Sequence, residues 1–106
     1  MLHIESVIHE VVAGLGVTVT KLERHNRSLA DQLDRASASV LLNVAEGNYS
    51  RKANRTARYS SALGSAGESR AVLQLAHARY GIEIDARLWD QLDHVIAVLC
   101  KLTRPK

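Results

Sequence analysis

The sequence predicts an all-α protein, a single antiparallel up-down-up-down four-helix bundle that spans residues 1–106. Apolar residues make up 46% of the chain but aromatic residues only 4%, so the core must consist of aliphatic side chains that fit between helices. Six glycines and one proline are too few for a turn-rich β domain. Apolar side chains also recur at steps of three and four residues in four separate segments. A chain of this length forms one domain with a substantial core.

The first helix is expected over residues 2–24. Its apolar stripe consists of Ile4, Val7, Ile8, Val11, Val12, Leu15, Val19 and Leu22. Gly14 and Gly16 each cost about 1 kcal/mol relative to alanine, and the alternating Val and Thr residues that follow favour strands. We therefore expect a bend or frayed backbone near these two glycines.

The second helix is expected to begin after Ser28, a residue type that commonly caps helix N-termini. It carries a bundle-type heptad stripe made of Leu29, Leu33, Ala36, Val40, Val44 and Gly47. Gly47 follows Glu46 at the end of this stripe, and glycine readily takes the left-handed conformation that closes helices. We expect the helix to end there.

The third helix is expected to begin at a cap on Ser50 or Asn54 and to end at Tyr80-Gly81. Its many small residues, Gly64 among them, predict a crowded helix crossing.

The fourth helix is expected over residues 85–102. Its inner stripe consists of Leu88, Leu92, Val95, Ile96, Leu99 and Leu102. Connections as short as these reverse the chain direction at every step. The link between the second and third helices should therefore lie at the same end as both chain termini.

Motifs for catalysis or metal binding are weak. Gly14-Leu15-Gly16 lacks the third glycine of a dinucleotide-binding fingerprint, because Val19 stands in its place. His9-Glu10 begins like a zinc-protease helix, but Ala13 occupies the position of the second histidine. The single cysteine, Cys100, can form no internal disulfide, and we expect it to be half buried. The sequence predicts a protein with no catalytic residue, metal or cofactor.

Two patterns bear on localisation. The N-terminal segment lacks the basic start and continuous apolar run of a signal peptide. No stretch approaches 18 uninterrupted apolar residues, so we expect a cytoplasmic protein without a membrane segment.

The formal charge of +3 is compatible with a polyanionic partner but does not establish one.

The main functional signal is a basic cluster between Asn48 and Tyr59 that no acidic residue interrupts. Three of its arginines are spaced i, i+4, i+7 and share one helix face, and basic residues near the C-terminus should converge on the same end of the bundle. The predicted set comprises Arg51, Lys52, Arg55, Arg58, Lys101, Arg104 and Lys106. Arginine binds phosphate well, and Tyr49 and Tyr59 offer stacking surfaces. The cluster predicts binding of RNA or DNA, RNA favoured, although a merely solvated face remains the alternative.

Two segments carry a family resemblance. They are residues 32–47, which end in Asn43-Val44-Ala45-Glu46-Gly47, and a run in the third helix with Ala62, Gly64, Ser65 and Glu68. Both resemble motifs of the four-helix-bundle proteins encoded within intervening sequences of large-subunit ribosomal RNA genes. The Asn-x-Ala-Glu-Gly segment is fairly specific when it is combined with the second run.

The resemblance implies an antiparallel four-helix bundle that assembles into a cyclic homo-oligomer, commonly a homopentamer. It also implies kinship with the accessory variability determinant of diversity-generating retroelements, a basic bundle that partners a reverse transcriptase and RNA. No catalytic residue comes with it. Asn43, Glu46, Gly47, Gly64 and Glu68 are then positions of a structural motif. We expect Asn43 and Glu46 to bind free backbone groups of a neighbouring segment, as polar residues near helix ends commonly do.

The sequence therefore predicts a non-catalytic, oligomeric nucleic-acid-binding adaptor, as an accessory subunit of a reverse transcriptase or of another nucleic-acid enzyme. Ring assembly would strengthen a weak basic patch, since several copies would face one polyanion. The alternative is a structural or protein–protein interaction bundle with no specific nucleic-acid role.

Overall fold

The computed structural model describes residues 4–105, which form four helices and no strand. The helices are α1 (Ile4–Leu22), α2 (Arg27–Asn48), α3 (Lys52–Tyr80) and α4 (Ala86–Thr103). The all-α class and the four predicted helices are confirmed. The predicted start of the first helix at Leu2 and the basic residue Lys106 lie outside the described residues.

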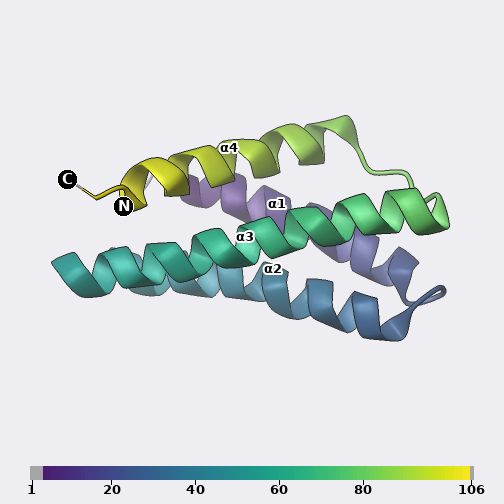
Figure 1. Cartoon of the computed structure of the whole chain (residues 1–106), viewed down its shortest axis with the longest axis horizontal. Helices are drawn as coiled ribbons and strands as arrows, with labels where there is room; N and C mark the ends of the chain where they lie inside the picture. Colours follow the sequence, from purple (N-terminus) through teal and green to yellow (C-terminus); the bar gives the residue numbers. More distant parts are fainter. Residues whose placement is uncertain (1–3, 106) are drawn as a thin grey trace.

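The helices lie side by side in an elongated bundle of 42 × 24 × 22 Å. Figure 1 shows the α1–α2 and α3–α4 connections at one end, and the α2–α3 connection at the other end with the start of α1 and the end of α4. The side-chain contacts agree, because Glu5 in the first turn of α1 accepts a hydrogen bond from Asn48 in the last turn of α2. We call the end that holds the α2–α3 connection, residues 49–51, the 49–51 end.

The core is aliphatic and follows the predicted stripes. The largest fully buried side chains include Ile8, Val11, Leu15, Leu22, Leu33, Val40, Val44, Leu73, Leu92, Val95 and Leu99. The stripe of α4 is shorter than predicted, because Leu102 is 39% exposed beyond the last buried leucine.

Helix α1 continues without interruption through Gly14 and Gly16, so the expected bend or fraying is wrong. A Cβ atom on Gly14 would lie 2.9 Å from Cδ1 of Leu88, so the glycine allows α4 to pack closely against α1. Leu15 and Thr18 are buried in the same stretch. Tertiary burial of one helix face outweighs the weak helix propensity of this segment.

Two helix ends differ from the predictions and one agrees. Asn26, not Ser28, caps α2, because its side-chain oxygen accepts a hydrogen bond from the backbone N–H of Leu29 at 2.9 Å. Gly47 lies within α2, which continues to Asn48, so the expected left-handed closure at Gly47 is wrong. Gly81 ends α3 in the left-handed conformation with φ of 65°, as predicted.

Candidate nucleic-acid interface

The first two turns of α3 project from the core. Residues 51–58 are all exposed. Arg51 is the N-cap residue, no side chain caps the helix, and the first turn contains no acidic residue. Neither Ser50 nor Asn54 caps α3 as predicted. The Ser50 hydroxyl donates instead to the backbone carbonyl of Glu46 in α2, at 2.8 Å. Uncapped N–H groups give a helix start a partial positive charge, which here adds to that of the basic side chains.

Lys52 opens α3 with a positive φ of 30°, in a backbone region that residues with a Cβ rarely adopt. The neighbouring connection is held by hydrogen bonds, including those from the backbone N–H of Tyr49 to Glu46 and from that of Ser50 to Gly47. Strain of this kind persists only where surrounding contacts impose it. The basic side chains therefore start from an ordered, tightly turned backbone.

Arg55 has a structural contact in addition to its charge. Its Nε donates to the backbone carbonyls of Gly47 at 3.3 Å and Ser50 at 3.2 Å. These bonds hold the guanidinium over the end of α2. Within residues 4–105, its terminal nitrogens have no hydrogen-bond acceptor, so their four N–H groups remain for a phosphate.

Arg58 is paired with an acidic residue from another helix. Its guanidinium lies 2.9 Å from a carboxylate oxygen of Glu46 in α2, and both side chains are about half exposed. The cluster is therefore free of acids in sequence but not in space. The expectation that Glu46 binds backbone groups is wrong, because Glu46 is exposed on the flank of α2 that faces α3. An exposed pair of this kind contributes about 0–1 kcal/mol, so a phosphate can replace its carboxylate at little cost.

The remaining predicted cations come from the end of α4. Lys101 lies in the last turn of α4, Arg104 is the C-cap residue, and both are exposed. Figure 1 shows this end of α4 at the 49–51 end, where α3 begins. The structure thus brings the two predicted groups of basic residues to one end of the molecule, on different helices.

The two tyrosines that flank the cluster differ in exposure. Tyr49 is 88% exposed and can stack on a base, whereas Tyr59 is only 4% exposed. The Tyr59 hydroxyl donates to Oδ1 of Asn48 at 2.6 Å, and Asn48 in turn donates to Glu5. Burial raises the pKa of the Tyr59 phenol, the nearby charge of Arg55 lowers it, and Glu5 raises it. The expected stacking role of Tyr59 is therefore wrong, because its ring belongs to the core.

Asn43 and Ser39 form a polar contact at the α2–α3 seam. Asn43 donates to the backbone carbonyl of Ser39 at 2.9 Å and to its hydroxyl at 3.0 Å, and Ser65 of α3 donates to the same hydroxyl at 2.7 Å. The expectation that Asn43 binds a neighbouring segment is therefore wrong, because its acceptors lie one turn back in its own helix. It supports the helix pair indirectly, through Ser39.

Gly64 and Glu68 are exposed on the outer side of α3. A Cβ atom on Gly64 would meet no atom within 4 Å, so the expected close crossing does not occur at Gly64 itself. Other small residues of α3, Ala62, Ala66 and Ala76, are fully buried in the core. The small residues on the outer side of α3 face outward, away from the core.

No helix in residues 4–105 is long and apolar enough to cross a membrane. In the same range, no group of three or more His, Cys, Asp or Glu residues is arranged to hold a metal ion. Cys100 is exposed, not half buried as expected, because it lies beside Leu99 on the outer flank of α4.

The fold and this surface define a small helical bundle with an exposed basic end. The chain belongs to the 23S rRNA-intervening sequence protein family, whose profile matches residues 9–101. The predicted family resemblance is thus confirmed.

A solved structure supports the same fold. It is a protein of unknown function from the S23 ribosomal protein family of Bacteroides thetaiotaomicron, with a TM-score of 0.80 and 15% sequence identity. The likeness covers 96% of this chain and 99% of that one. The comparison with curated proteins gave no match.

Proposed function

We propose that this protein is a non-catalytic nucleic-acid-binding adaptor that prefers RNA to DNA and binds it through the 49–51 end. The observation that carries the proposal is the uncapped, fully exposed start of α3, where Arg51, Lys52 and Arg55 lie around a positive helix terminus. Such a surface attracts phosphate irrespective of sequence, and the attraction falls as salt rises.

The basic residues have different roles in the proposed contact. Arg51 and Lys52 are exposed and make no hydrogen bond or ion pair through their side chains to any residue in 4–105. Arg55 is oriented by its bonds to the end of α2 and presents its terminal nitrogens to a phosphate. Arg58 exchanges Glu46 for a phosphate when the nucleic acid arrives. Tyr49, with its ring exposed, stacks on an unpaired base, which favours single-stranded RNA or loops.

The proposed working form is a cyclic homo-oligomer of antiparallel bundles, a homopentamer, which presents several basic ends to one polyanion. The outer side of α3 supports assembly. Its exposed residues follow heptad steps and are mostly small: Ala57, Ser61, Gly64, Glu68, Ala71, Leu75 and Ala78. Small residues at this spacing let a second helix approach closely.

We further propose that the protein acts in the cytoplasm as an accessory subunit of a nucleic-acid enzyme such as a reverse transcriptase, as in the related retroelement determinant. This part of the proposal rests on the kinship that the sequence resemblance implies and not on a contact in the structure. Co-purification of the chain with the enzyme encoded beside its gene tests it separately from RNA binding.

A binding titration with a charge-matched control tests the interface. The test variant is Arg51→Glu with Lys52→Glu, since neither side chain makes an internal bond that the change would break. The control is Arg24→Glu with Arg79→Glu, which makes the same change in net charge at two exposed positions, one in the α1–α2 connection and one in the last turn of α3. Figure 1 shows both of these helix ends at the opposite end of the bundle. Fluorescence anisotropy measures the binding of labelled single-stranded RNA, of hairpin RNA and of DNA of the same sequence.

We expect the test variant to lose at least about tenfold in RNA affinity and to have a flatter salt dependence, since each lost phosphate contact removes about 0.7 from the slope of log K against log salt. The control should lose much less. Equal losses in both variants would mean that only net charge matters. RNA binding unchanged in the test variant would leave a structural or protein-interaction bundle, and light scattering would report whether that bundle self-associates.

A further inference from the structure

A carboxylate of α1 reaches the 49–51 end and binds the residue that precedes the exposed Tyr49. Glu5 lies in the first turn of α1, and its side chain accepts a hydrogen bond from the side-chain amide of Asn48. Asn48 is the last residue of α2, and Tyr49 follows it as the C-cap residue. The bond therefore links α1 directly to the connection that carries the candidate interface.

The side-chain amide of Asn48 is bonded through both of its polar atoms. Its nitrogen donates to Glu5, and its Oδ1 accepts from the hydroxyl of Tyr59 at 2.6 Å. A carboxylate can only accept, so it must face the NH2 group and leaves the amide oxygen to the phenol. Because the ring of Tyr59 is buried in the core, Asn48 is held in one orientation between partners from α1 and α3.

Tyr49 depends on its backbone for its orientation. Its ring is 88% exposed, so packing does little to hold it in place. The backbone before it is held by the bonds of Asn48, and its own N–H donates to the carbonyl of Glu46 at 3.2 Å. A side chain that is already held in its bound orientation loses less entropy when a ligand arrives. The bonds of Asn48 should therefore raise the affinity of Tyr49 for a base.

The charge of Glu5 does not itself attract a nucleic acid. Burial raises the pKa of the Tyr59 phenol, Arg55 lowers it and Glu5 raises it, so both charges lie near this ring. A carboxylate this close to the basic residues repels phosphate and weakens its binding. Any favourable contribution of Glu5 must therefore come from its hydrogen bond to Asn48.

We propose that Glu5 and Asn48 are positioning residues of the candidate interface, which hold the backbone at Tyr49 so that its ring stacks on an unpaired base of RNA. This inference rests on the RNA-binding function proposed above. Neither positioning residue needs to touch the nucleic acid. Their hydrogen bond makes the first turn of α1 part of an interface whose contacting side chains come from other segments of the chain.

Two substitutions of Glu5 separate its hydrogen bond from its charge. Glu5→Gln removes the charge but keeps an oxygen that accepts from Asn48, whereas Glu5→Ala removes both. Glu5→Ala should bind single-stranded RNA at least about threefold more weakly than Glu5→Gln, because part of the stacking on Tyr49 is lost. The two variants have the same net charge and the same phosphate contacts, so their salt dependences should be parallel. Equal affinities of the two variants would overturn the proposal.

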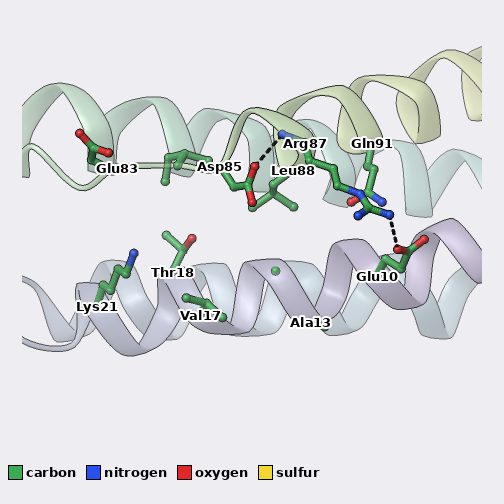
Figure 2. Close-up of a pocket in the computed structure, with 12 residues that line it drawn as sticks. Glu10, Ala13, Val17, Thr18, Lys21, Glu83, Asp85, Arg87, Leu88 and Gln91 are labelled. Atoms are coloured by element: carbon green, nitrogen blue, oxygen red, sulfur yellow. Dashed lines mark hydrogen bonds and ion pairs between the residues drawn. The ribbon is translucent and has the colours of Figure 1, made fainter.

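Glu10 provides a matched control on the same helix. Figure 2 shows it beside a groove between α1 and the start of α4, where its carboxylate accepts from Arg87 at 3.0 Å. Glu10→Ala and Glu10→Gln make the same changes at a carboxylate whose partner lies in the first turn of α4. These two variants should bind RNA equally. If they differ as much as the two Glu5 variants do, loss of any such bond from α1 has the same effect and the positioning role is wrong.

Tyr49→Ala completes a double-mutant cycle. In that background, Glu5→Ala and Glu5→Gln should bind single-stranded RNA equally, since the ring that they position is gone. A difference that persists would contradict the proposal. Asn26→Ala is the control for stability, because it removes a helix cap at the opposite end of the bundle. It should bind RNA as the parent does, and a loss equal to that of Glu5→Ala would mean that only stability matters.

Relaxation of the backbone amides tests the positioning role without RNA. The NMR order parameter of the Tyr49 amide should fall in Glu5→Ala and stay at the parent value in Glu5→Gln. Equal order parameters in these two variants would refute the role of Glu5. If Arg51→Glu with Lys52→Glu loses RNA affinity while the Glu5 variants bind equally, the interface stands and only the positioning role is wrong. If that double variant keeps the parent affinity, the interface itself is wrong.

Discussion

The ring of Tyr59 fills the space that a side chain on Gly47 would need. A Cβ atom on Gly47 would lie 2.5 Å from Cε1 and 2.8 Å from Cδ1 of Tyr59, and 3.3 Å from the Cβ of Arg58. Because Gly47 has no side chain, α3 approaches α2 closely enough to bury Tyr59 and to let its hydroxyl reach Asn48. Gly47 therefore sets the spacing of the two helices immediately beside the basic residues.

Gly47→Ala should destabilise the protein even though alanine is the better helix former. The added methyl group must displace the buried ring, which we expect to cost about 1–3 kcal/mol, more than the gain of about 1 kcal/mol in helix propensity. Gly67→Ala is the matched control, because its Cβ would meet nothing and the substitution should stabilise α3 by up to about 1 kcal/mol. Urea denaturation of both variants measures the two effects, and a stabilised Gly47→Ala would contradict the described packing.

Tyr59 should make stability depend on pH in the alkaline range. Burial raises the pKa of its phenol in the folded state above the ordinary value of about 10. The phenol of the unfolded chain therefore loses its proton at a lower pH than the phenol of the folded chain. The stability that the neutral phenol contributes is fully present below about pH 10 and is lost as the pH rises through the folded-state pKa. The measurement compares the parent with Tyr59→Phe, so that the contribution of this phenol is isolated.

The free energy of unfolding of the parent should fall more steeply than that of Tyr59→Phe as the pH rises above about 10. At neutral pH, Tyr59→Phe should cost about 0.5–1.5 kcal/mol, because Asn48 loses its donor. Parallel pH profiles for the two proteins would argue that the phenol is as accessible in the folded chain as in the unfolded one.

The periodicity of the sequence was sufficient to predict the core. Leu33, Val40, Leu92 and Leu99 recur at helical steps, and all are fully buried. Local signals at the helix ends were less reliable. Gly47 has the sequence features of a terminator, but its conformation depends on the ring of a residue twelve positions later, which no local pattern encodes.

The sequence predicted which basic residues form the candidate interface, but not which of them form ion pairs with acidic residues. Arg51 and Lys52 are exposed as expected, whereas Arg58 is bound to Glu46. Arg58 lies seven residues after the 49–51 connection but Glu46 only three before it, and Tyr59 lies eight after but Gly47 only two before. The contacts are therefore offset about the link, and counting residues from the connection did not indicate which side chains would meet. The Asn48–Glu5 bond joins still more distant segments and had no sequence signal either.

Asn26 should matter more than the cap expected from the sequence. Its side chain accepts from the N–H of Leu29 and donates to the hydroxyl of Tyr80, which ties the start of α2 to the end of α3. Asn26→Ala should cost about 1–2 kcal/mol in thermal or urea unfolding. Ser28→Ala at the neighbouring exposed position should change stability by less than about 0.5 kcal/mol. A larger effect at Ser28 than at Asn26 would mean that the helix starts elsewhere.

Glu46→Gln should improve nucleic-acid binding at little cost in stability. The substitution keeps the size of the side chain but removes the negative charge that holds Arg58 at 2.9 Å. Both side chains are about half exposed, so the loss of stability should be under about 1 kcal/mol. The freed guanidinium should then tighten RNA binding by roughly two- to fivefold at low salt and steepen its salt dependence.

Glu23→Gln is the control for this change, because it removes the same charge from an exposed position in the α1–α2 connection, at the other end of the bundle. Anisotropy titrations of both variants against one single-stranded RNA, at two salt concentrations, separate a local effect at Arg58 from a general effect of net charge. If both variants gain equally, Arg58 makes no particular contact. If Glu46→Gln binds RNA more weakly than the parent, the carboxylate orients Arg58 for the phosphate and does not compete with it.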